Sequence, residues 1–387
     1  MQQAFYRDLR LGILGGGQLG RMLIQAAIDY NVHIRVLDPG ADAPCRPYAH
    51  TFVQGSLRDY NTVMAFGQDC DVITIEIEHV NTEALAALQA AGKQVFPDPA
   101  VIRMIQDKRL QKQFYQAHGL PTAAFTLTDD RAAVAALRDR LPLVHKLGRE
   151  GYDGRGVQVL RTEQDLNTTF DAPGLVEELV PFVKEVAILA ARNPAGQTAV
   201  FDPVEMMFHP EANLVEYLFA PADLSPALAD SARTLALRLL EALDYVGIMA
   251  VEMFLTPDGT WLINEAAPRP HNSGHHTIRA CDTSQYEQHL RAILGLPLGS
   301  TRQHTPAAMV NILGAPGHTG PAAYAYLREV LEMEGVYPHL YGKTETKPFR
   351  KMGHVTLLDP DPLQLRARAL FVKDHLQAIV ASELPLP

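Results

Sequence analysis

The stretch from Gly247 to His276 constrains the fold of this chain more than any other. It holds two apolar runs, Met249–Leu255 and Trp261–Asn264, on either side of the sequence Thr-Pro-Asp-Gly. A Pro-Asp-Gly turn between two short apolar runs is typical of strands that fold back on each other. The stretch therefore predicts a β-hairpin.

Each arm of this hairpin carries one acidic residue among apolar neighbours, Glu252 in the first and Glu265 in the second. Pairing that is symmetric about the turn sets Glu252 opposite Ile263 and Ala250 opposite Glu265. The two glutamates then share a face as diagonal neighbours, about 7–8 Å apart. Two carboxylates at this spacing repel each other unless a cation lies between them, and Mg²⁺ typically takes one or two carboxylates together with phosphates. A solvated sheet edge is the alternative explanation.

The residues after the second arm favour a functional site over a solvated edge. Asn264–His276 reads NEAAPRPHNSGHH, which combines an arginine, two amides, a hydroxyl and three histidines in a loop punctuated by Pro and Gly. Polar groups on a loop that a rigid strand holds are typical of binding and catalytic sites.

Composition sets the size of the protein and excludes several functions. At 387 residues the chain is too long for one small core, and we expect two or three domains. A net charge of −10 argues against a nucleic-acid or membrane-surface protein, while local sites for small anions stay open. Three widely spaced cysteines without a CxxC pair suit a reducing compartment, and we find no signal peptide or membrane-spanning run. We therefore expect a cytoplasmic protein.

The N-terminal region has the pattern of a dinucleotide-binding fold. An apolar strand, Leu9–Leu14, is followed by the motif GxGxxG between Gly15 and Gly20 and by a helical pattern through Ile28. Asp38 ends the next strand. This pattern predicts a Rossmann-like unit, and an NAD-dependent oxidoreductase is one hypothesis for its function. The loop is weakly specific, because a glycine loop at a helix N-terminus can hold any phosphate.

A third strand, Val72–Ile77, runs into two acidic residues, Glu76 and Glu78. The carboxyl ends of parallel strands border the ligand crevice of such sheets, so these acids are candidates for contact with a ligand. The alternative is that they supply negative charge to the start of a helix capped at Asn81.

Basic side chains and glycines characterise the next region. A helix is predicted over residues 101–118, and Lys108 lies on its basic face, which a solvated surface would also explain. Further on, a glycine-rich loop joins two predicted strands, Leu143–Lys146 and Val157–Leu160. Because this loop lies between strands, it is not a P-loop. It is either a flap that folds over phosphate oxygens or a plain mobile turn.

The remaining segments alternate strands and helices. We expect a strand at Leu175–Val180, a helix over Ser225–Leu243 that a Ser-Pro cap begins, and another helix at Ser284–Leu294. The tail from Thr305 is predicted to form short strands. Its basic cluster, Lys343–Lys351, is either a site for a monophosphate ester or a solvated loop.

With these segments in order, the chain resembles the ATP-grasp ligases and, among them, the 5-(carboxyamino)imidazole ribonucleotide synthetase family of purine biosynthesis. The resemblance covers nearly the whole chain. It rests on five stretches: GGGQLGRM (Gly15–Met22), EIEHV (Glu76–Val80), GYDGRG (Gly151–Gly156), NEAAPRPHNSGHH (Asn264–His276) and RKMGH (Arg350–His354).

The resemblance implies an α/β (α+β) protein with the ATP-grasp fold, an N-terminal Rossmann-like pre-ATP-grasp domain and a small C-terminal region. The expected divisions are residues 1–105 for the first domain, 106–185 for the ATP-grasp lid, and 186–387 for the large domain with the C-terminal region. The implied activity is ATP- and bicarbonate-dependent carboxylation of the exocyclic amine of 5-aminoimidazole ribonucleotide through carboxyphosphate, with release of ADP and phosphate. It also implies Mg²⁺ or Mn²⁺ and a cytoplasmic homodimer that binds neither nucleic acid nor membrane.

The resemblance also implies roles for individual residues. ATP is expected to contact Lys108, Lys146, Gly151, Gly154, Gly156, Glu177, Glu178, Leu179, Val180, Glu185, His209, Asn264 and Glu265. The ribonucleotide is expected at Gln18, Leu19, Glu76, Lys343, Arg350 and Lys351. The catalytic residues are expected to be Arg269, His271, Asn272, Tyr152, Asp153 and Arg155, with Arg269 holding bicarbonate. The metal is expected at Glu252 and Glu265, in agreement with the hairpin.

Two positions depart from the family pattern. Lys108 stands where the family usually has arginine, which keeps the charge but loses the bidentate geometry. Val157 stands where the family usually has glutamine, so Val157 is left out of the site. His271 is the candidate general base, although a lone histidine is more often structural.

Three other functions compete with this one. The nearest is another ATP-grasp carboxylate–amine ligase, such as a formate-dependent glycinamide ribonucleotide transformylase. The others are an NAD-dependent oxidoreductase and a nucleotide sensor that binds ATP without turnover. Formation of ADP with and without aminoimidazole ribonucleotide and bicarbonate separates all four.

Overall fold

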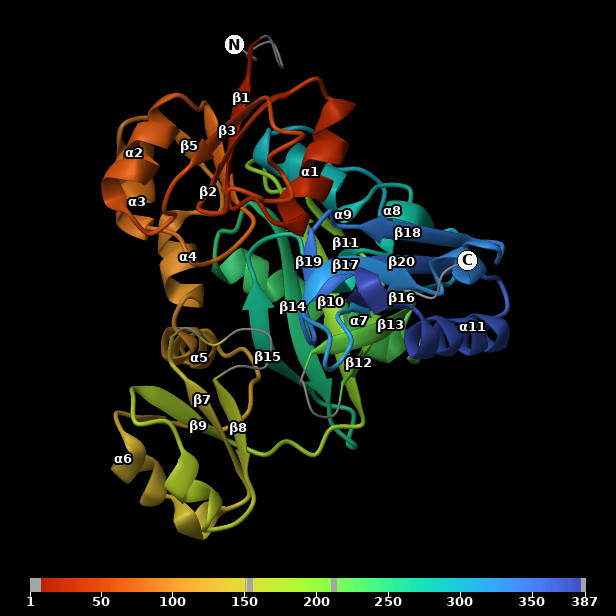
Figure 1. Ribbon diagram of the computed structural model, residues 1–387. Coiled ribbons are helices and arrows are strands. Elements are labelled where there is room, and N and C mark those ends of the chain that lie inside the picture. Colours follow the sequence, from red (N-terminus) through yellow and green to blue (C-terminus); the bar gives the residue numbers. More distant parts are fainter. Residues whose placement is uncertain (1–7, 150, 152–155, 210–213, 384–387) are drawn as a thin grey trace.

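The computed structural model describes residues 8–149, 151, 156–209 and 214–383. Within these ranges the chain forms an N-terminal parallel sheet, a small antiparallel sheet reached through two short helices, and a large sheet that runs through the rest of the molecule (Figure 1). A three-stranded sheet completes the C-terminal part. Every described helix is too short or too polar to span a membrane.

The N-terminal sheet has five parallel strands in the order β3-β2-β1-β4-β5. This order is that of a Rossmann-like sheet, so the predicted N-terminal unit is confirmed. The predicted third strand stops at Ile75, before its two acids, and β3 was not predicted. The elements are β1 (Arg10–Leu14), α1 (Gln18–Ile28), β2 (His33–Asp38), β3 (Thr51–Gln54), α2 (Tyr60–Gln68), β4 (Val72–Ile75), α3 (Thr82–Ala90) and β5 (Gln94–Val95).

The single helix expected over residues 101–118 is wrong. The structure has two helices there, α4 (Pro99–Ile105) and α5 (Lys108–Ala117). The break falls at Asp107, whose carboxylate caps α5 by accepting a hydrogen bond from the backbone N–H of Arg109 at 3.0 Å. The helical periodicity continues across the break, so only the cap residue could have indicated it.

The small sheet is antiparallel, with strand order β6-β9-β7-β8, and it lies at one end of the molecule (Figure 1). Lys146 pairs with Val157 at the loop end of the β7–β8 hairpin, so the glycine-rich loop joins two strands as predicted. The elements are β6 (Phe125–Thr128), α6 (Arg131–Ala135), η1 (Arg138–Arg140), β7 (Leu143–Leu147), β8 (Val157–Leu160), η2 (Asp165–Thr168) and β9 (Gly174–Glu178).

The large sheet has the strand order β15-β14-β10-β12-β13-β16-β20-β18, with β11 paired to β10. The tail does not form short strands only, because β16 and β20 continue this sheet over seven and eight residues. The strands are β10 (Lys184–Arg192), β11 (Thr198–Val200), β12 (Val204–Phe208), β13 (Val215–Ala220), β14 (Gly247–Leu255), β15 (Trp261–Ala267), β16 (Ala307–Leu313), β18 (Val336–Leu340) and β20 (Lys351–Leu358).

The other elements cover the large sheet or form the three-stranded sheet β19-β17-β21. They are α7 (Pro226–Ala242), η3 (Asn272–Gly274), α8 (Thr277–Ala280), α9 (Gln285–Ile293), β17 (Gly320–Ala325), α10 (Leu327–Leu331), β19 (Glu345–Thr346), α11 (Pro362–His375), β21 (Gln377–Val380) and η4 (Ala381–Glu383). The predicted helices at Ser225 and Ser284 are both present, and each serine is the N-cap.

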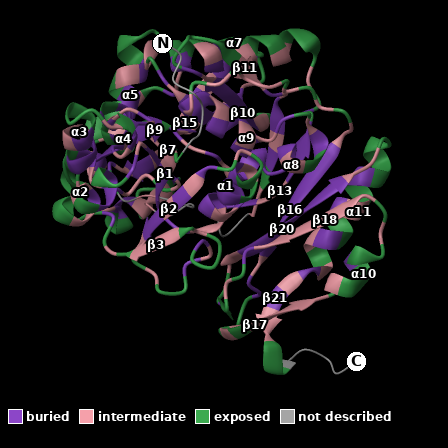
Figure 2. Cartoon of the chain, turned by 90° about the horizontal axis from the view of Figure 1, so that it is seen from above, coloured by how far each residue is buried: buried purple, intermediate pink, exposed green. Residues whose placement is uncertain are grey.

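The main core lies between α7 and the face of β10 and β14. Apolar residues of α7, among them Leu235 and Leu239, pack on Val186, Met249 and Val251 of the two strands. Strands of the large sheet are buried along much of their length (Figure 2). Burial of this size holds the hairpin strands rigid. The acidic side chains on the other face of β14 therefore have a fixed support.

Candidate active site

The hairpin pairs in a different register from the one expected. Glu252 lies directly opposite Glu265, and Met253 lies opposite Ile263, with Asn264 as an extra residue that forms a β-bulge. The expected pairing of Glu252 with Ile263 is wrong. The expected outcome of that pairing, two carboxylates on one face, is nevertheless observed, and they are direct partners instead of diagonal neighbours.

Two local features produce this register. The backbone N–H of Thr256 donates to the carbonyl of Thr260 at 3.0 Å, so the connection has three residues instead of two and shifts the pairing by one position. A shift of one position alone would place the two glutamates on opposite faces, because side chains alternate along a strand. The bulge at Asn264 adds a second shift and returns Glu265 to the face of Glu252.

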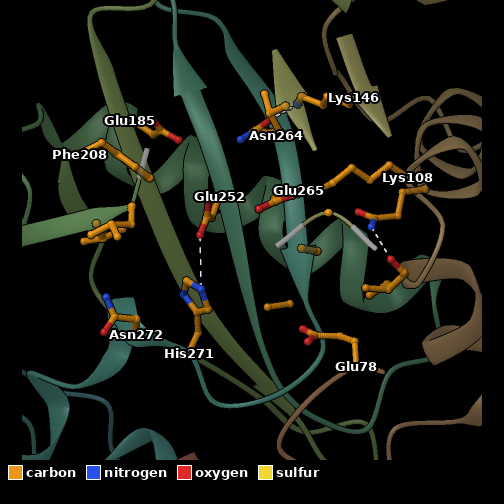
Figure 3. A pocket seen from close by; sticks show the side chains of 18 of the residues that line it. Glu78, Lys108, Lys146, Glu185, Phe208, Glu252, Asn264, Glu265, His271 and Asn272 are labelled. Carbon is orange, nitrogen blue, oxygen red and sulfur yellow. Dashed lines mark hydrogen bonds and ion pairs between the residues drawn. The ribbon is translucent and has the colours of Figure 1, made fainter. Parts of the chain in front are cut away.

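The two opposed glutamates differ in their electrostatic environment. Burial raises the pKa of Glu252 well above its ordinary value, and the negative charges of Glu265 and Glu185 raise it further. Glu265 forms an ion pair with Lys108, and this ammonium lowers the pKa of Glu265 to about 2. Figure 3 shows both carboxylates pointing into the same space, with Glu185 on the neighbouring strand. The opposed pair, with the charge of Glu185 nearby, makes this space favourable for a cation.

A buried cluster of charges lies next to this space. The carboxylate of Glu177 accepts from the ammonium groups of Lys112 (2.7 Å) and Lys146 (2.8 Å). Burial opposes ionisation of Glu177, but the two lysines lower its pKa to about 2. Lys146 also donates to the side-chain oxygen of the bulge residue Asn264 at 2.8 Å (Figure 3). These contacts fix the Lys146 ammonium close to the acidic pair.

These groups line one cavity of about 880 Å³ between the small sheet, the hairpin and the N-terminal sheet. Its size suits a nucleotide and a second substrate together. The predicted site residues that line it are Gln18, Leu19, Glu76, Lys108, Lys146, Gly151, Glu177, Glu178, Leu179, Val180, Glu185, Glu252, Asn264, Glu265, Arg269, His271, Asn272 and Lys351.

Other predicted residues lie elsewhere or cannot be placed. His209, Gly156, Lys343 and Arg350 are described by the structure, and they are not part of the lining of this cavity. His209 instead packs its ring against Phe349, with the ring centroids 5.2 Å apart. Tyr152, Asp153, Gly154 and Arg155 lie outside the described residues.

One wall of the cavity is aromatic, and it was not predicted from the sequence. Phe182 and Phe254 stack with their ring centroids 4.7 Å apart, and both line the cavity. Phe254 lies two residues after Glu252 on β14, so the period of two along a strand could have placed it on the same face. Lys112 was also missed as a partner of Glu177, because a solvated surface explains the basic face of the predicted helix equally well.

The loop after β15 presents three polar side chains to the cavity. Arg269 forms an ion pair with Glu78 at 2.8 Å, and Nε2 of His271 lies 3.5 Å from Oε1 of Glu252 (Figure 3). The side-chain amide of Asn272 is buried and has no hydrogen-bond partner within the described part of the chain. A buried amide that lines a cavity in this way is available to a ligand.

The tautomer of His271 follows from its hydrogen bonds. The backbone N–H of Ser273 donates to Nδ1 of His271 at 3.3 Å, so Nδ1 is an acceptor. In the neutral ring the hydrogen therefore lies on Nε2, the atom that faces Glu252. In this arrangement His271 donates toward the carboxylate, which does not suit the expected role of general base.

The glycine loop of the N-terminal sheet is filled by the chain's own carboxylates. Glu76 accepts from the backbone N–H groups of Gly17 (3.0 Å) and Gly20 (3.1 Å), and Asp38 accepts from that of Gly16 (2.7 Å). Burial raises the pKa of Glu76, while the two backbone hydrogen bonds favour its ionised form. These N–H groups would otherwise hold a dinucleotide phosphate. The arrangement thus disfavours the oxidoreductase hypothesis.

The acidic pair fits a hard divalent cation. Among the described residues no group of three or more His, Cys, Asp or Glu side chains is arranged to hold a metal by itself. Two opposed carboxylates from Glu252 and Glu265 leave most of the coordination shell to other oxygens, as Mg²⁺ requires when it binds nucleotide phosphates.

Three known domain families match successive parts of this chain. The ribonucleotide synthetase preATP-grasp domain family matches residues 9–106, the ATP-grasp domain family matches 113–286, and the phosphoribosylaminoimidazole carboxylase C-terminal domain family matches 307–368. The N5-carboxyaminoimidazole ribonucleotide synthase of Synechococcus elongatus is 41% identical over 358 residues, which cover 90% of this chain and 89% of that protein.

The chain belongs to the N5-carboxyaminoimidazole ribonucleotide synthase family. The family member from Brucella melitensis is 40% identical over 90% of this chain and 96% of its own length. Among solved structures, the synthetase of Thermotoga maritima has a TM-score of 0.89 at 38% identity and covers 96% of this chain and 99% of that one. The predicted ATP-grasp fold and the ligase class are thereby confirmed.

One solved relative carries both ligands of interest. The N5-carboxyaminoimidazole synthase of Aspergillus clavatus, in complex with ADP and 5-aminoimidazole ribonucleotide, has a TM-score of 0.86 at 31% identity and covers 95% of this chain and 99% of its own.

Proposed function

We propose that this protein uses ATP and bicarbonate to carboxylate the exocyclic amine of 5-aminoimidazole ribonucleotide, with ADP and phosphate as the other products. The observation that carries the proposal is the directly opposed pair Glu252 and Glu265 in the wall of a cavity of about 880 Å³. This pair lies in a chain that is 41% identical to a protein named for the same product. The reaction is a step of purine biosynthesis.

The nucleotide is proposed to lie between the small sheet and the hairpin. Lys146 is held by Glu177 and Asn264, so its ammonium is fixed where phosphate oxygens would enter. The stacked rings of Phe182 and Phe254 form an apolar wall for the base. Flap residues 152–155 belong to the proposed ATP and transfer site on the family resemblance alone.

Mg²⁺ or Mn²⁺, when bound, would neutralise charge on the phosphates, and Glu252 and Glu265 are the residues proposed to hold it. Lys108 already compensates the charge of Glu265 by an ion pair. Movement of the Lys108 ammonium from Glu265 toward a phosphate oxygen would keep it paired with a negative group in both states.

The chemistry is proposed to take two steps. An oxygen of bicarbonate forms a bond to the γ-phosphorus of ATP, and the bond to the β-phosphate oxygen breaks, which gives carboxyphosphate and ADP. The amine nitrogen then bonds to the carboxyl carbon, the phosphate leaves, and the amine loses a proton. Arg269, held by Glu78, is proposed to orient bicarbonate, and His271 and the unpaired amide of Asn272 are proposed to line the site of transfer to the amine.

The ribonucleotide is proposed to lie between the N-terminal sheet and the loop after β15, near Gln18, Leu19 and Glu76. Of the three basic residues expected to bind the ribonucleotide, Lys351 lines the cavity, whereas Lys343 and Arg350, the two expected at its phosphate, do not. Lys343 donates to the backbone carbonyl of Lys351 at 2.7 Å and is therefore proposed to support this contact.

One assay tests the function. The purified protein is incubated with MgATP, and ADP release is followed with 5-aminoimidazole ribonucleotide and bicarbonate, alone and together, while labelled bicarbonate reports the acid-labile carbamate. Full ADP release and label incorporation are expected only with both substrates. Activity with formate and glycinamide ribonucleotide instead would identify the related transformylase, and ATP binding without turnover would identify a sensor.

The remaining proposals concern organisation. We propose domain divisions at residues 105 and 185, a cytoplasmic location and a homodimer, all on family membership. Light scattering coupled to gel filtration tests the dimer directly, and limited proteolysis with fragment mass analysis tests the divisions.

A further inference from the structure

Helix α9 carries three polar side chains that are completely buried. Gln285, Gln288 and His289 each have 0% of their surface exposed. Glutamine and histidine are uncommon in such positions unless their hydrogen bonds are satisfied. Each of the three bonds to a segment outside the helix, and none of them has a role in the function proposed above.

Gln285 is paired with the backbone of His271 at two points. The N–H of His271 donates to Oε1 of Gln285, and Nε2 of Gln285 donates to the carbonyl of His271, both at 2.8 Å. Nε2 also lies 3.2 Å from Nδ1 of His275. A side chain at Gly274 would collide with the carboxamide, so the loop packs directly on Gln285.

His289 fixes the same helix to the two strands that lead to the acids. The backbone N–H of Ile248 on β14 donates to Nδ1 of His289 at 3.1 Å, and Nε2 is therefore the protonated nitrogen. Nε2 lies 2.9 Å from Oγ1 of Thr74 on β4. The strand β14 continues to Glu252, and β4 leads to Glu76. Helix α9 thus holds the loop at a set position relative to both acids.

We propose that Gln285 is a positioning residue for transfer of the carboxyl group to the amine, a proposal that rests on the function proposed above. It acts through His271 and the adjacent Asn272, which are proposed to line the site of transfer to the amine, and it touches no substrate itself. The groups that face the nucleotide phosphates, Lys146 and the acidic pair, are carried by strands β7, β14 and β15, whose backbone pairing does not involve Gln285. Loss of Gln285 therefore impairs amine carboxylation more than ATP cleavage.

The expected consequence is uncoupling. Carboxyphosphate that does not meet a correctly placed amine is attacked by water, which returns bicarbonate and releases phosphate. ADP then accumulates without an equal amount of carbamate. A purely structural role for Gln285 would lower both products in the same proportion.

Gln288 is a matched control on the same helix. It makes the same two-point contact, with Nε2 donating to the carbonyl of Gly299 at 2.9 Å and the N–H of Gly299 donating to Oε1 at 2.8 Å. Gly299 is not part of the cavity lining. Removal of either carboxamide leaves one backbone N–H and one carbonyl without a partner, so the cost to stability is similar.

The experiment compares Gln285→Met with Gln288→Met. ADP and labelled carbamate are measured in the same reaction with both substrates, and thermal unfolding is recorded for each variant. We expect similar losses of Tm in the two variants. The ratio of ADP to carbamate is expected to rise about tenfold or more in Gln285→Met, because small displacements of reacting groups have large effects on rate, and to stay as in the wild type in Gln288→Met. Equal ratios in the two variants would overturn the proposal.

A second pair of variants applies if the methionine variants do not fold. Gln285→Asn and Gln288→Asn keep the amide and withdraw it by one methylene, and the same difference in ratio is expected between them. The wild-type reaction distinguishes failure of the proposed function from failure of the proposed role of Gln285. A wild type that forms no carbamate refutes the proposed function, whereas a coupled wild type with a coupled Gln285→Asn variant refutes only the role of Gln285.

Discussion

Two groups of carboxylates in this protein have opposite environments. Asp38 and Glu76 accept four hydrogen bonds from backbone N–H groups, three from the glycine loop and one from Gly40, so their charges are satisfied by the chain itself. On the hairpin, Glu252 and Glu265 face each other across two strands, and the pKa of Glu252 is raised by burial and by its acidic neighbours. The carboxylates of the first group are fully hydrogen-bonded within the protein. In the second group Glu265 has an ion pair with Lys108, but the negative charge of the buried pair as a whole is not balanced.

The difference shows how far a motif specifies a ligand. The GxGxxG loop has the N–H groups of an anion site, but internal carboxylates occupy them. The hairpin has no named metal motif, and yet its geometry concentrates negative charge beside a large cavity. A ligand site is indicated where internal partners do not fully compensate the charges: Lys108 pairs with Glu265, but Glu252 forms no ion pair with a lysine or arginine among the described residues. Four experiments test this distinction.

The largest effect is expected at the hairpin. Glu265→Gln keeps the shape of the side chain and removes half of the acidic pair, so ATP cleavage should fall by about 10²- to 10³-fold or more. ADP release and circular dichroism are the measurements. Glu205→Gln is the control, because Glu205 pairs with Lys184 on the same sheet away from the cavity lining and should leave activity within about twofold. Near-normal ADP release by folded Glu265→Gln would remove it from the metal site.

The next effect concerns an acid that lysines satisfy. Glu177→Gln leaves Lys112 and Lys146 without their buried partner and should lower the free energy of unfolding at pH 7 by about 3–5 kcal/mol. The folded pKa of Glu177, about 2, lies below its ordinary value of 4.5. The stabilisation by Glu177 is therefore complete above pH 4.5 and is lost as the pH falls toward 2.

Urea unfolding of the wild type and Glu177→Gln at several pH values between 7 and 3 measures this effect. The difference between the two proteins should be constant down to about pH 5 and should shrink below it. A difference that stays unchanged to pH 3 would show that the ionised form of Glu177 has no special stability in the folded protein.

A smaller effect is expected at the glycine loop. Glu76→Gln replaces one of the two acceptor oxygens by an NH2 group, which cannot accept from a backbone N–H, and this should lower stability by about 1–3 kcal/mol. Because Glu76 also lines the cavity, the KM for the ribonucleotide should rise while the KM for ATP changes little. Asp38→Asn is the control, since Asp38 accepts from Gly16 and Gly40 at 2.7 Å each and is not in the cavity lining. A raised ribonucleotide KM in both variants would contradict a direct role for Glu76.

The smallest effect is an expected lack of binding. NAD⁺ titrated into the protein in a calorimeter should give no heat of binding, because Glu76 and Asp38 occupy the N–H groups that a pyrophosphate needs. ATP with Mg²⁺ should bind under the same conditions. Micromolar affinity for NAD⁺ would mean that the carboxylates yield to a dinucleotide and would restore the oxidoreductase hypothesis for the first domain.

The sequence predicted the fold to the extent that local signals define it. The first strand, helix and second strand of the N-terminal unit, the caps at Ser225 and Ser284 and the two strands that flank the glycine-rich loop all follow from short patterns. The break at Asp107 was missed because helical periodicity runs through it, and only the local cap that Asp107 forms with the N–H of Arg109 marks the new helix start. The hairpin register was wrong because neither the three-residue connection nor the bulge has a strong signature in composition.

Site residues were predictable where a charged side chain lies within a family motif, and they were harder to predict where the side chain is apolar or lies outside the motifs. Acidic and basic residues of the predicted set line one cavity. Phe254 was missed because an apolar side chain in a strand resembles a core residue, and Phe182 was missed because it lies in the connection between β9 and β10. The role of Gln285 could not be inferred from the sequence at all. Its contact with His271 joins a helix to a loop and exists only in the folded protein.

The bulge at Asn264 has one more consequence, for association between molecules. Strand β15 is the last strand of its sheet, and a long, flat outer strand invites pairing with another chain and aggregation. The bulge bends this rim, and Ile263 donates its backbone N–H to Pro121 at 2.8 Å, so part of the rim is already engaged within the molecule. The β-bulge that places Glu252 and Glu265 on one face therefore also disfavours pairing of the edge strand β15 with another molecule.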